Sequence, residues 1–270
     1  MADYPVADQL HKNPAIHCTT LAITQNVIIG TEWPKFAEPD AGLRNGTLTF
    51  VKSDGRTYAI TCQHIIQHYR DVLKSSGREF SHSMRTMLNG FHHVQDRFIQ
   101  PTAQHGDGPP DIAIREINPD HIAHIGKRPL DLDALREPPE GIRHAYAVGF
   151  PESLKYNKHD EGDRFGYRAS IPQVEVLAEL SRRPDRRFTM FSELAKPAAD
   201  IDYSGMSGGP IFWSTEDEYG ILGIVYEGGP GEGNSSIYVY GELATPDVIR
   251  DWIAQCPPRE GKAVDRGSKV

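Results

Sequence analysis

Short runs of apolar and β-branched residues, closed by turn residues, set the pattern of the chain. Residues 47–51, Thr-Leu-Thr-Phe-Val, alternate polar and apolar side chains in the manner of a half-buried strand. The dipeptides Asn45-Gly46 and Asp54-Gly55 bracket this run, and both are typical of tight turns. A second strand-like run, residues 58–62, follows the second turn. The pattern therefore predicts a β-hairpin.

The same kind of run recurs along the chain, whereas helical periodicity is rare. Trp252 and Ile253 belong to a predicted C-terminal helix that has Pro246 near its first turn. Residues 66–73 read as a short helical stretch, and residues 67–105 read as a polar insertion of helix or loop. The other predicted strands are residues 20–24, 27–30, 111–114, 145–150, 173–178, 187–191, 211–213, 219–226 and 237–240.

The composition agrees with a fold of many short strands. Of the 270 residues, 38% are hydrophobic and 24% are charged, and 25 Gly and 20 Pro supply many turns. This mixture is typical of a globular protein, and the length is enough to bury a substantial core. We expect one large domain or two small domains packed together.

The formal net charge of −8 limits the partners of the protein. Nucleic-acid binding depends on clustered Lys and Arg residues, so we expect no nucleic-acid partner. The first residues, Met-Ala-Asp-Tyr-Pro, lack the positive start and apolar run of a secretory signal, and no later stretch is long enough to span a bilayer. We therefore expect no membrane partner and a cytoplasmic location.

The cysteines and histidines suggest neither a disulfide framework nor a metal site. Three cysteines, Cys18, Cys62 and Cys256, leave at least one thiol unpaired, which favours a reducing compartment. His68, His92 and His93 in the polar region show no regular metal-ligand spacing, and the sequence has no CxxC or HExxH pattern. We expect no metal and no cofactor.

A serine among three glycines is the first sign of chemistry. It lies in residues 203–210, Tyr-Ser-Gly-Met-Ser-Gly-Gly-Pro, just before an apolar strand. Glycine adopts backbone conformations that other residues avoid, so this turn can expose Ser207 and aim N–H groups inward. The N–H groups of Gly205 and Ser207 could then hold the charge on a carbonyl oxygen attacked by Ser207. Alone, the segment also fits a glycine-rich β-turn with an accidental serine.

A base and an acid that orients it lie at two other strand ends. His64 directly follows the strand over residues 58–62, where rigid structure can position it, although a structural histidine is the alternative. Asp111 leads the strand over residues 111–114, and a partly buried carboxylate there needs a partner such as a histidine Nδ1–H. Asp107 is a rival, but a strand end positions a side chain better than a glycine-flanked loop.

In this order, His64, Asp111 and Ser207 resemble the catalytic residues of the chymotrypsin-like (trypsin-like) serine peptidases. Their spacings of 47 and then 96 residues suit the family, whereas an α/β-hydrolase would place its serine before its histidine. The resemblance covers about residues 18–256 and includes the C-terminal helix. It rests on Ile60-Thr61-Cys62-Gln63-His64, Asp111-Ile112-Ala113-Ile114, Gly205-Met206-Ser207-Gly208-Gly209-Pro210 and Gly223-Ile224-Val225-Tyr226-Glu227-Gly228.

The resemblance implies an all-β fold of two antiparallel β-barrels with a C-terminal helix, and a serine endopeptidase that acts on proteins or peptides. His64 would take the proton of Ser207, Asp111 would orient the imidazole, and the N–H groups of Gly205 and Ser207 would form the oxyanion hole. The implied domains are an arm at 1–17, an N-terminal barrel with His64 and Asp111 at 18–125, a linker at 126–142, a C-terminal barrel and closing helix with Ser207 at 143–256, and a disordered tail at 257–270.

The resemblance also implies residues that select the substrate. Ile201 falls at the base of the primary specificity pocket, and an apolar base favours a small or apolar side chain before the cut bond. Nearby Asp200, Asp202 and Glu227 could reverse that preference toward Arg or Lys. The implied wall of the pocket consists of Tyr226, Glu227 and Gly228.

Two departures from the family pattern change the expectations. Met206 stands where members activated by zymogen cleavage carry an aspartate, so we expect no such activation and a closer likeness to intracellular and bacterial branches. Cys62 stands where the family usually has alanine, and we interpret it as a buried core thiol. The alternative function is a gated or non-catalytic peptide-binding or regulatory member of the same fold, which needs a partner protein for activity.

Overall fold

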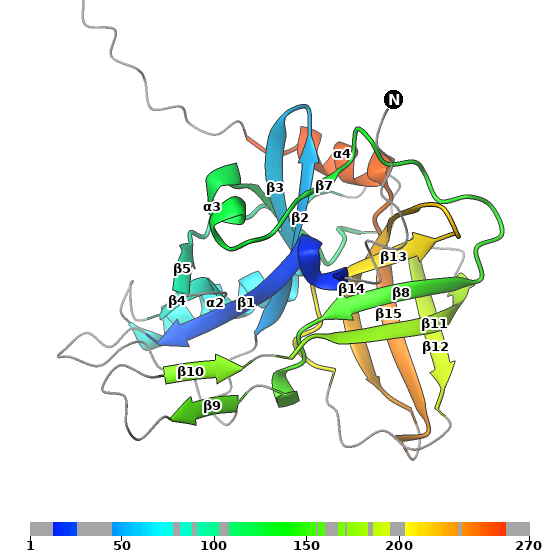
Figure 1. Ribbon diagram of the computed structural model, residues 1–270. Coiled ribbons are helices and arrows are strands. Elements are labelled where there is room, and N and C mark those ends of the chain that lie inside the picture. Colours follow the sequence, from blue (N-terminus) through cyan, green and yellow to red (C-terminus); the bar gives the residue numbers. More distant parts are fainter. Residues whose placement is uncertain are drawn as a thin grey trace, which may run out of the picture.

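The computed structural model describes residues 13–25, 45–77, 82–87, 91–102, 108–154, 156–159, 167–170, 172–182, 186–194, 203–231 and 234–257. Two sheets, one from each half of the chain, lie beside each other (Figure 1). The predicted strand at residues 27–30, the predicted pocket residue Ile201 and the rival acid Asp107 lie outside the described residues.

The first half of the chain forms a seven-stranded sheet. Its strands are β1 (Cys18–Gln25), β2 (Gly46–Ser53), β3 (Arg56–Thr61), β4 (His82–Met87), β5 (Phe91–Val94), β6 (Ala113–Glu116) and β7 (Leu130–Asp131). The order is β5-β4-β1-β2-β3-β6 with antiparallel neighbours, and β7 adds to β2 in parallel. The sheet curls into a half-barrel with β5 and β6 at its edges, and an isolated bridge between Ile99 and Ile114 lies at the β6 edge.

The predicted hairpin is confirmed as β2 and β3. Asp54 and Gly55 both have positive φ, 49° and 72°, between the paired residues Ser53 and Arg56. This is the two-residue turn whose twist matches that of the flanking strands. The second strand of the hairpin, β3, ends three residues before His64 and so positions it.

The second half of the chain forms a closed six-stranded barrel. Its strands are β8 (His144–Gly149), β11 (Val174–Arg182), β12 (Arg187–Glu193), β13 (Pro210–Ser214), β14 (Tyr219–Pro230) and β15 (Ser236–Leu243). They follow the order β11-β12-β15-β14-β13-β8, and the pairing of β8 with β11 closes the barrel. A separate pair, β9 (Tyr156–His159) and β10 (Tyr167–Ser170), lies outside it.

Short helices connect and close the two halves. The predicted C-terminal helix is confirmed as α4 (Pro246–Ala254), which buries Ile249 and Trp252 and has Pro at its start. Within the described residues, the other helices are η1 (Pro14–His17), α2 (Gln63–Ser76), α3 (Pro119–His124) and η3 (Glu152–Leu154).

The prediction of a polar insertion over residues 67–105 is wrong. α2 extends to Ser76, and β4 and β5 then belong to the first sheet, where β4 pairs with β1. β4 contributes the buried Met84, opposite Ile23 of β1. The sequence of β4, His-Ser-Met-Arg-Thr-Met, has only two apolar residues, which is too few to mark a strand by its apolar pattern.

One apolar core crosses between the halves. It combines Phe50 and Ile60 of the first sheet with Phe212 and Ile224 of the second barrel and with Trp252 of α4. The predicted linker over residues 126–142 contributes β7 and the buried Leu130 and Leu132 to this core. A second core fills the closed barrel. The shared core holds the facing edges of the two halves together.

Within the part of the chain that the structure describes, no helix combines the length and the apolar character that crossing a membrane requires.

Candidate active site

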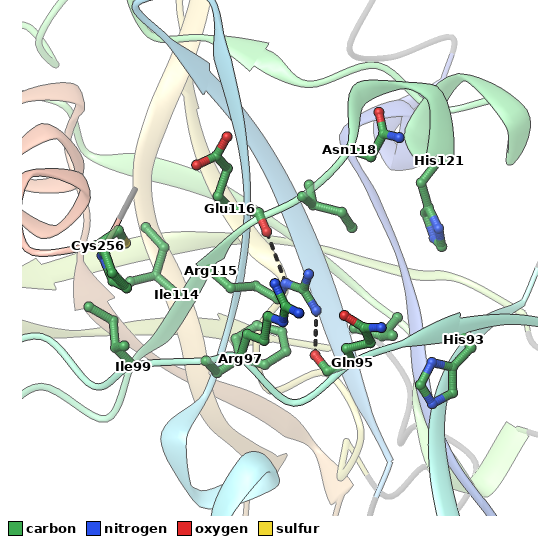
Figure 2. Close-up of a pocket in the computed structure, with 14 residues that line it drawn as sticks. His93, Gln95, Arg97, Ile99, Ile114, Arg115, Glu116, Asn118, His121 and Cys256 are labelled. Atoms are coloured by element: carbon green, nitrogen blue, oxygen red, sulfur yellow. Dashed lines mark hydrogen bonds between the residues drawn. The ribbon is translucent and has the colours of Figure 1, made fainter. Parts of the chain in front are cut away.

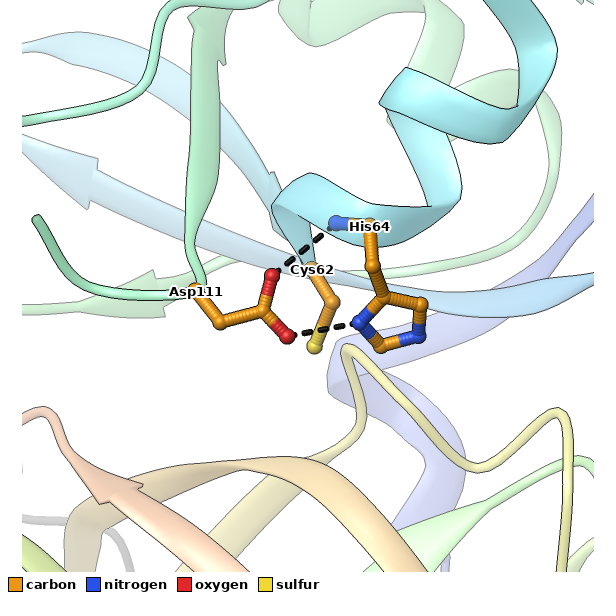
Figure 3. A group of neighbouring side chains, drawn as sticks. All are labelled: Cys62, His64 and Asp111. Atoms are coloured by element: carbon orange, nitrogen blue, oxygen red, sulfur yellow. Dashed lines mark hydrogen bonds and ion pairs between the residues drawn. The ribbon is translucent and has the colours of Figure 1, made fainter. Parts of the chain in front are cut away.

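His64 and Asp111 meet because β3 and β6 are neighbours. Thr61, the last residue of β3, lies opposite Ala113, the first residue of β6. His64 in the first turn of α2 and Asp111 just before β6 therefore lie at the same end of this strand pair (Figure 3). Their strand-end placement is what the sequence predicts.

The Asp111 carboxylate is oriented by two contacts with His64. Its Oδ2 lies 2.6 Å from His64 Nδ1, and its Oδ1 accepts the backbone N–H of His64 at 2.9 Å (Figure 3). Because an ionised carboxylate only accepts, Nδ1 carries the proton in this contact. In the neutral imidazole, Nε2 then has the free lone pair. The two side chains are 34% and 24% exposed, so this pair is open to a ligand.

The turn that carries Ser207 requires its glycines. Gly208 has φ of +93°, and a Cβ there would lie 2.0 Å from Thr47 O. A Cβ on Gly209 would lie 2.1 Å from Val148 O. Only a residue without a side chain allows the turn to approach the backbone this closely.

Two threonines of β2 hold the serine turn from the first half of the chain. Thr47 donates its N–H to Ser207 O at 2.8 Å and its hydroxyl to Gly205 O at 3.0 Å. The hydroxyl of Thr49 donates to Gly208 O at 2.7 Å. The two side-chain contacts join residues that are 158 and 159 positions apart in the sequence. They therefore fix Ser207 relative to the first sheet, whose strand β3 leads into the helix that carries His64.

A further contact orients the N–H of Gly205. The carbonyl of the preceding residue, Ser204, accepts the N–H of Glu152 at 2.6 Å. In a trans peptide, C=O and N–H point in opposite directions, so the Gly205 N–H points away from Glu152. Asn45 holds Glu152 by donating to both carboxylate oxygens at 2.8 Å, and its own side-chain oxygen accepts the N–H of Ile23 at 2.8 Å.

Sequence reasoning missed Asn45 and Glu152. Asn45 read only as half of a turn dipeptide, and its partner lies 107 positions away. A polar pair of this separation leaves no local pattern in the sequence.

One pocket of about 290 Å³ brings most of the predicted site residues together. Gly228, on β14, is not part of its lining, and Ile201 lies outside the described residues. Ser207 Oγ donates to the carbonyl of Tyr226 at 3.0 Å. The lining residues are Asn45, His64, Ile65, Asp111, Ser204, Gly205, Ser207, Tyr226 and Glu227.

The architecture of this chain matches solved structures, whereas its sequence matches no known family. No protein-family model and no curated protein matches the chain in sequence. Among solved structures, a thermostable serine protease, AL20, from an extremophilic microorganism aligns with 88% of this chain and 96% of its own, at 11% identity and a TM-score of 0.50. The fold is chymotrypsin-like. The predicted two-barrel fold is confirmed, with the first barrel left open between β5 and β6.

A second solved structure, the protease Anisep from Arthrobacter nicotinovorans, aligns with 93% of this chain and 95% of its own. Its identity is 15% and its TM-score is 0.44.

Cys62 lies beneath the site in this chymotrypsin-like fold. It is fully buried, as the sequence predicts, and its thiol donates to Val225 O at 3.1 Å. Burial and, secondarily, the nearby Asp111 carboxylate raise the pKa of Cys62 well above its ordinary value. The free protein therefore holds a neutral thiol here.

The open edge of the first sheet forms a second, larger hollow. This groove of about 890 Å³ runs between the β5 end and β6 and contains none of the predicted site residues (Figure 2). Arg115 bridges it, donating to the carbonyls of Gln95 and Glu116. Its guanidinium also lies over the ring of Phe98, at 5.8 Å from the centroid. The Arg115 side chain and the backbone bridge between Ile99 and Ile114 therefore both connect the segment after β5 with β6.

Proposed function

We propose that the protein is a serine endopeptidase that cuts its substrate through an acyl-enzyme intermediate. Ser207 attacks the carbonyl, His64 accepts the serine proton through Nε2 and returns a proton to the leaving amine, and Asp111 holds the imidazole in the required tautomer. The observation that carries this proposal is the 2.6 Å contact of Asp111 with His64 Nδ1 in a pocket that Ser207 also lines.

The N–H groups of Gly205 and Ser207 serve as the oxyanion hole in this proposal. Support comes from the peptide before Gly205, whose carbonyl is bound by Glu152 so that its N–H points the other way. Donors fixed in place before the reaction stabilise the charge at no cost in reorganisation. Asn45 holds the carboxylate of Glu152, and the backbone N–H of Glu152 holds the peptide that supplies the Gly205 N–H. Asn45 therefore helps to position one donor of the oxyanion hole.

Proteins or peptides are the proposed substrates, and β14 provides the wall beside the cut bond. Tyr226 and Glu227 line the pocket, and Gly228 follows them on the same strand. These residues of β14 form the wall of the proposed specificity pocket.

Zymogen cleavage has no part in the proposed activation. Met206 is fully buried within the core of the closed barrel. An apolar side chain in this place cannot form an ion pair with a newly cut N-terminus. The turn is held instead by the bonds from Thr47 and Thr49.

A gated form of the same enzyme, or a non-catalytic member of the fold, is the second candidate. The observation that favours it is the bond from Ser207 Oγ to Tyr226 O, which directs the hydroxyl to a backbone carbonyl. Catalysis requires the hydroxyl to turn toward His64, and such contacts often tighten only when substrate binds. A partner protein could favour the turned rotamer.

Labelling by a fluorophosphonate probe tests the proposal. The wild-type protein is expected to react at one serine, and Ser207→Ala is expected to lose labelling and to lower peptide turnover by roughly 10⁴-fold or more. The thermal unfolding temperature of the variant should stay close to that of the wild type.

Adding cell lysate separates the two candidates. Labelling of Ser207 that requires lysate supports the gated form. The absence of labelling in both conditions, together with no cleavage in a broad peptide library, contradicts the enzyme and supports the non-catalytic reading.

A further inference from the structure

Three potential metal ligands of different chemistry meet at the bottom of the proposed active site. The Sγ of Cys62, a ring nitrogen of His64 and a carboxylate oxygen of Asp111 all lie within 4.8 Å of one another. Figure 3 shows the sulfur beside the contact between the carboxylate and the ring. A serine, histidine and aspartate are sufficient for the proposed hydrolysis, so this mechanism leaves the thiol without a role.

We propose that Cys62, His64 and Asp111 form a zinc site whose occupation switches the enzyme off. Thiolate, imidazole and carboxylate are the three protein ligands that Zn²⁺ prefers, and three of them with one open position are typical of an accessible site. Because a thiolate is a soft ligand, the site is a poor one for Mg²⁺ and Ca²⁺, which prefer oxygen ligands.

Binding the ion would move the ligand atoms by about 1–2 Å, because they now lie within 4.8 Å of one another and Asp111 Oδ2 lies where the ion would meet Nδ1. Zinc bonds of about 2.0–2.3 Å place tetrahedral ligand atoms about 3.3–3.8 Å apart. The present 2.6 Å between His64 Nδ1 and Asp111 Oδ2 would open by about 1 Å, because the proton between them is replaced by the ion. Asp111 keeps the backbone N–H of His64 on its other oxygen.

The thiol can leave its present partner without isolating it. Cys62 donates to Val225 O, but the same carbonyl also accepts the N–H of Gly208 at 2.7 Å. Val225 O therefore stays hydrogen-bonded when the thiol turns to the metal. A buried carbonyl with a remaining donor avoids the cost of an unmade hydrogen bond.

The charges of the bound site balance. Zn²⁺ with one thiolate, one carboxylate and a neutral imidazole has no net charge, so the metal removes the reason that burial disfavours the thiolate. The thiol proton leaves to solvent, and the proton of His64 Nδ1 moves to Nε2. Entry is from the pocket, because His64 and Asp111 are partly exposed whereas Cys62 is fully buried.

This proton shift explains the switch, which rests on the proposed function. His64 with zinc on Nδ1 presents an N–H at Nε2, so it cannot accept the proton of Ser207. The bound ion also removes Asp111 from its role as partner of the ring. Zinc would thus inhibit without touching the serine.

Direct metal binding and probe labelling, measured side by side on the full chain, test the proposal. Calorimetry with zinc chloride is expected to give one ion per chain, and cobalt(II) is expected to give a thiolate charge-transfer band. Cys62→Ala should lose the band and bind zinc at least about tenfold more weakly. Zinc should suppress fluorophosphonate labelling of the wild type, a chelator should restore it, and in Cys62→Ala the rates with and without zinc should be nearly equal.

The chain offers matched controls for this experiment. Cys18→Ala and Cys256→Ala remove the other two buried thiols and should leave zinc binding unchanged. Cys62→Ser preserves the size of the side chain if the alanine variant unfolds more easily. Ser207→Ala should bind zinc like the wild type, so binding is measurable without activity.

The outcomes separate the metal site from the proposed function. Equal zinc affinity in the wild type and both Cys62 variants, or no bound ion, overturns the metal proposal. Cys62-dependent binding in a protein that is never labelled keeps the metal site and contradicts the peptidase. Labelling that zinc does not change, in a protein that binds zinc through Cys62, overturns the switch alone.

Discussion

At the residue scale, the proposed chemistry depends on which nitrogen of His64 carries the proton. Asp111 binds both Nδ1 and the backbone N–H of the same residue, so it fixes the ring orientation and the tautomer together. The carboxylate in turn depends on its position directly before β6.

Asp111→Asn tests this dependence. The amide can donate to Nδ1 and so favour the wrong tautomer, and turnover is expected to fall by about 10⁴-fold, as in the trypsin template. Peptide turnover and labelling rate measure the effect, with thermal unfolding as the check on folding. A fall of less than about tenfold would show that Asp111 is not the orienting acid.

Prediction from sequence works at this scale when a strand end carries the residue. His64, Asp111 and Ser207 each adjoin a strand that the apolar pattern marks, and all three line one pocket. The partner of Ser207 Oγ could not be predicted in this way, because it is the backbone carbonyl of Tyr226, which is the same chemical group in every residue.

At the scale of elements, the serine turn connects β2 with β14 through hydrogen bonds with Thr47, Thr49 and Val225. Its glycines allow the backbone to come within contact of Thr47 and Val148, and its bonds to Thr47 and Thr49 tie it to the first sheet. The turn therefore depends on packing in both halves of the fold.

Gly208→Ala tests the turn as an element. A methyl group at φ +93° and 2.0 Å from Thr47 O cannot fit without moving the backbone. We expect a loss of at least about 2 kcal/mol in the free energy of unfolding, measured in denaturant, and a loss of probe labelling.

Gly229→Ala is the matched control for this change. Gly229 lies on β14, and a Cβ there has no atom within 4 Å. We expect a change below about 0.5 kcal/mol in unfolding free energy. Equal effects at the two positions would contradict the argument from close approach.

At the scale of the whole molecule, His17 joins three separate segments. Its Nδ1–H donates to the carbonyl of Arg128 at 2.8 Å, and its Nε2 accepts from the hydroxyl of Tyr219 on β14 at 2.9 Å. The residue is 8% exposed. Burial lowers the pKa of His17 from 6.5 to about 4, because the surroundings disfavour its charged form.

The stability of the molecule is therefore expected to fall in acid. Between pH 6.5 and about 4 the unfolded chain binds a proton at His17 that the folded protein does not, so stability decreases as the pH falls through this range. The loss attributable to His17 is about 3 kcal/mol at pH 4. Denaturant unfolding at a series of pH values measures it.

His17→Gln provides the comparison, since glutamine can still donate and accept but does not titrate. The variant is expected to be less stable at pH 7 and to lose less stability in acid than the wild type. Parallel pH curves for the two proteins would contradict the role of His17.

The sequence by itself determined the local features and their order: the Asp54-Gly55 hairpin, the glycine turn of Ser207, the C-terminal helix and the strand ends of His64 and Asp111. Each of these features depends on the backbone conformations that a few neighbouring residues allow. Those conformational preferences are properties of the residue types, so the sequence alone is enough to predict them.

Only the tertiary structure decided which distant groups meet. The pairing of β4 with β1, the support of Glu152 by Asn45, the place of Thr47 under the serine turn and the position of Cys62 beside the acid and base all join segments far apart in sequence. Such contacts follow from the packing of two sheets around a shared core, and no local pattern encodes them.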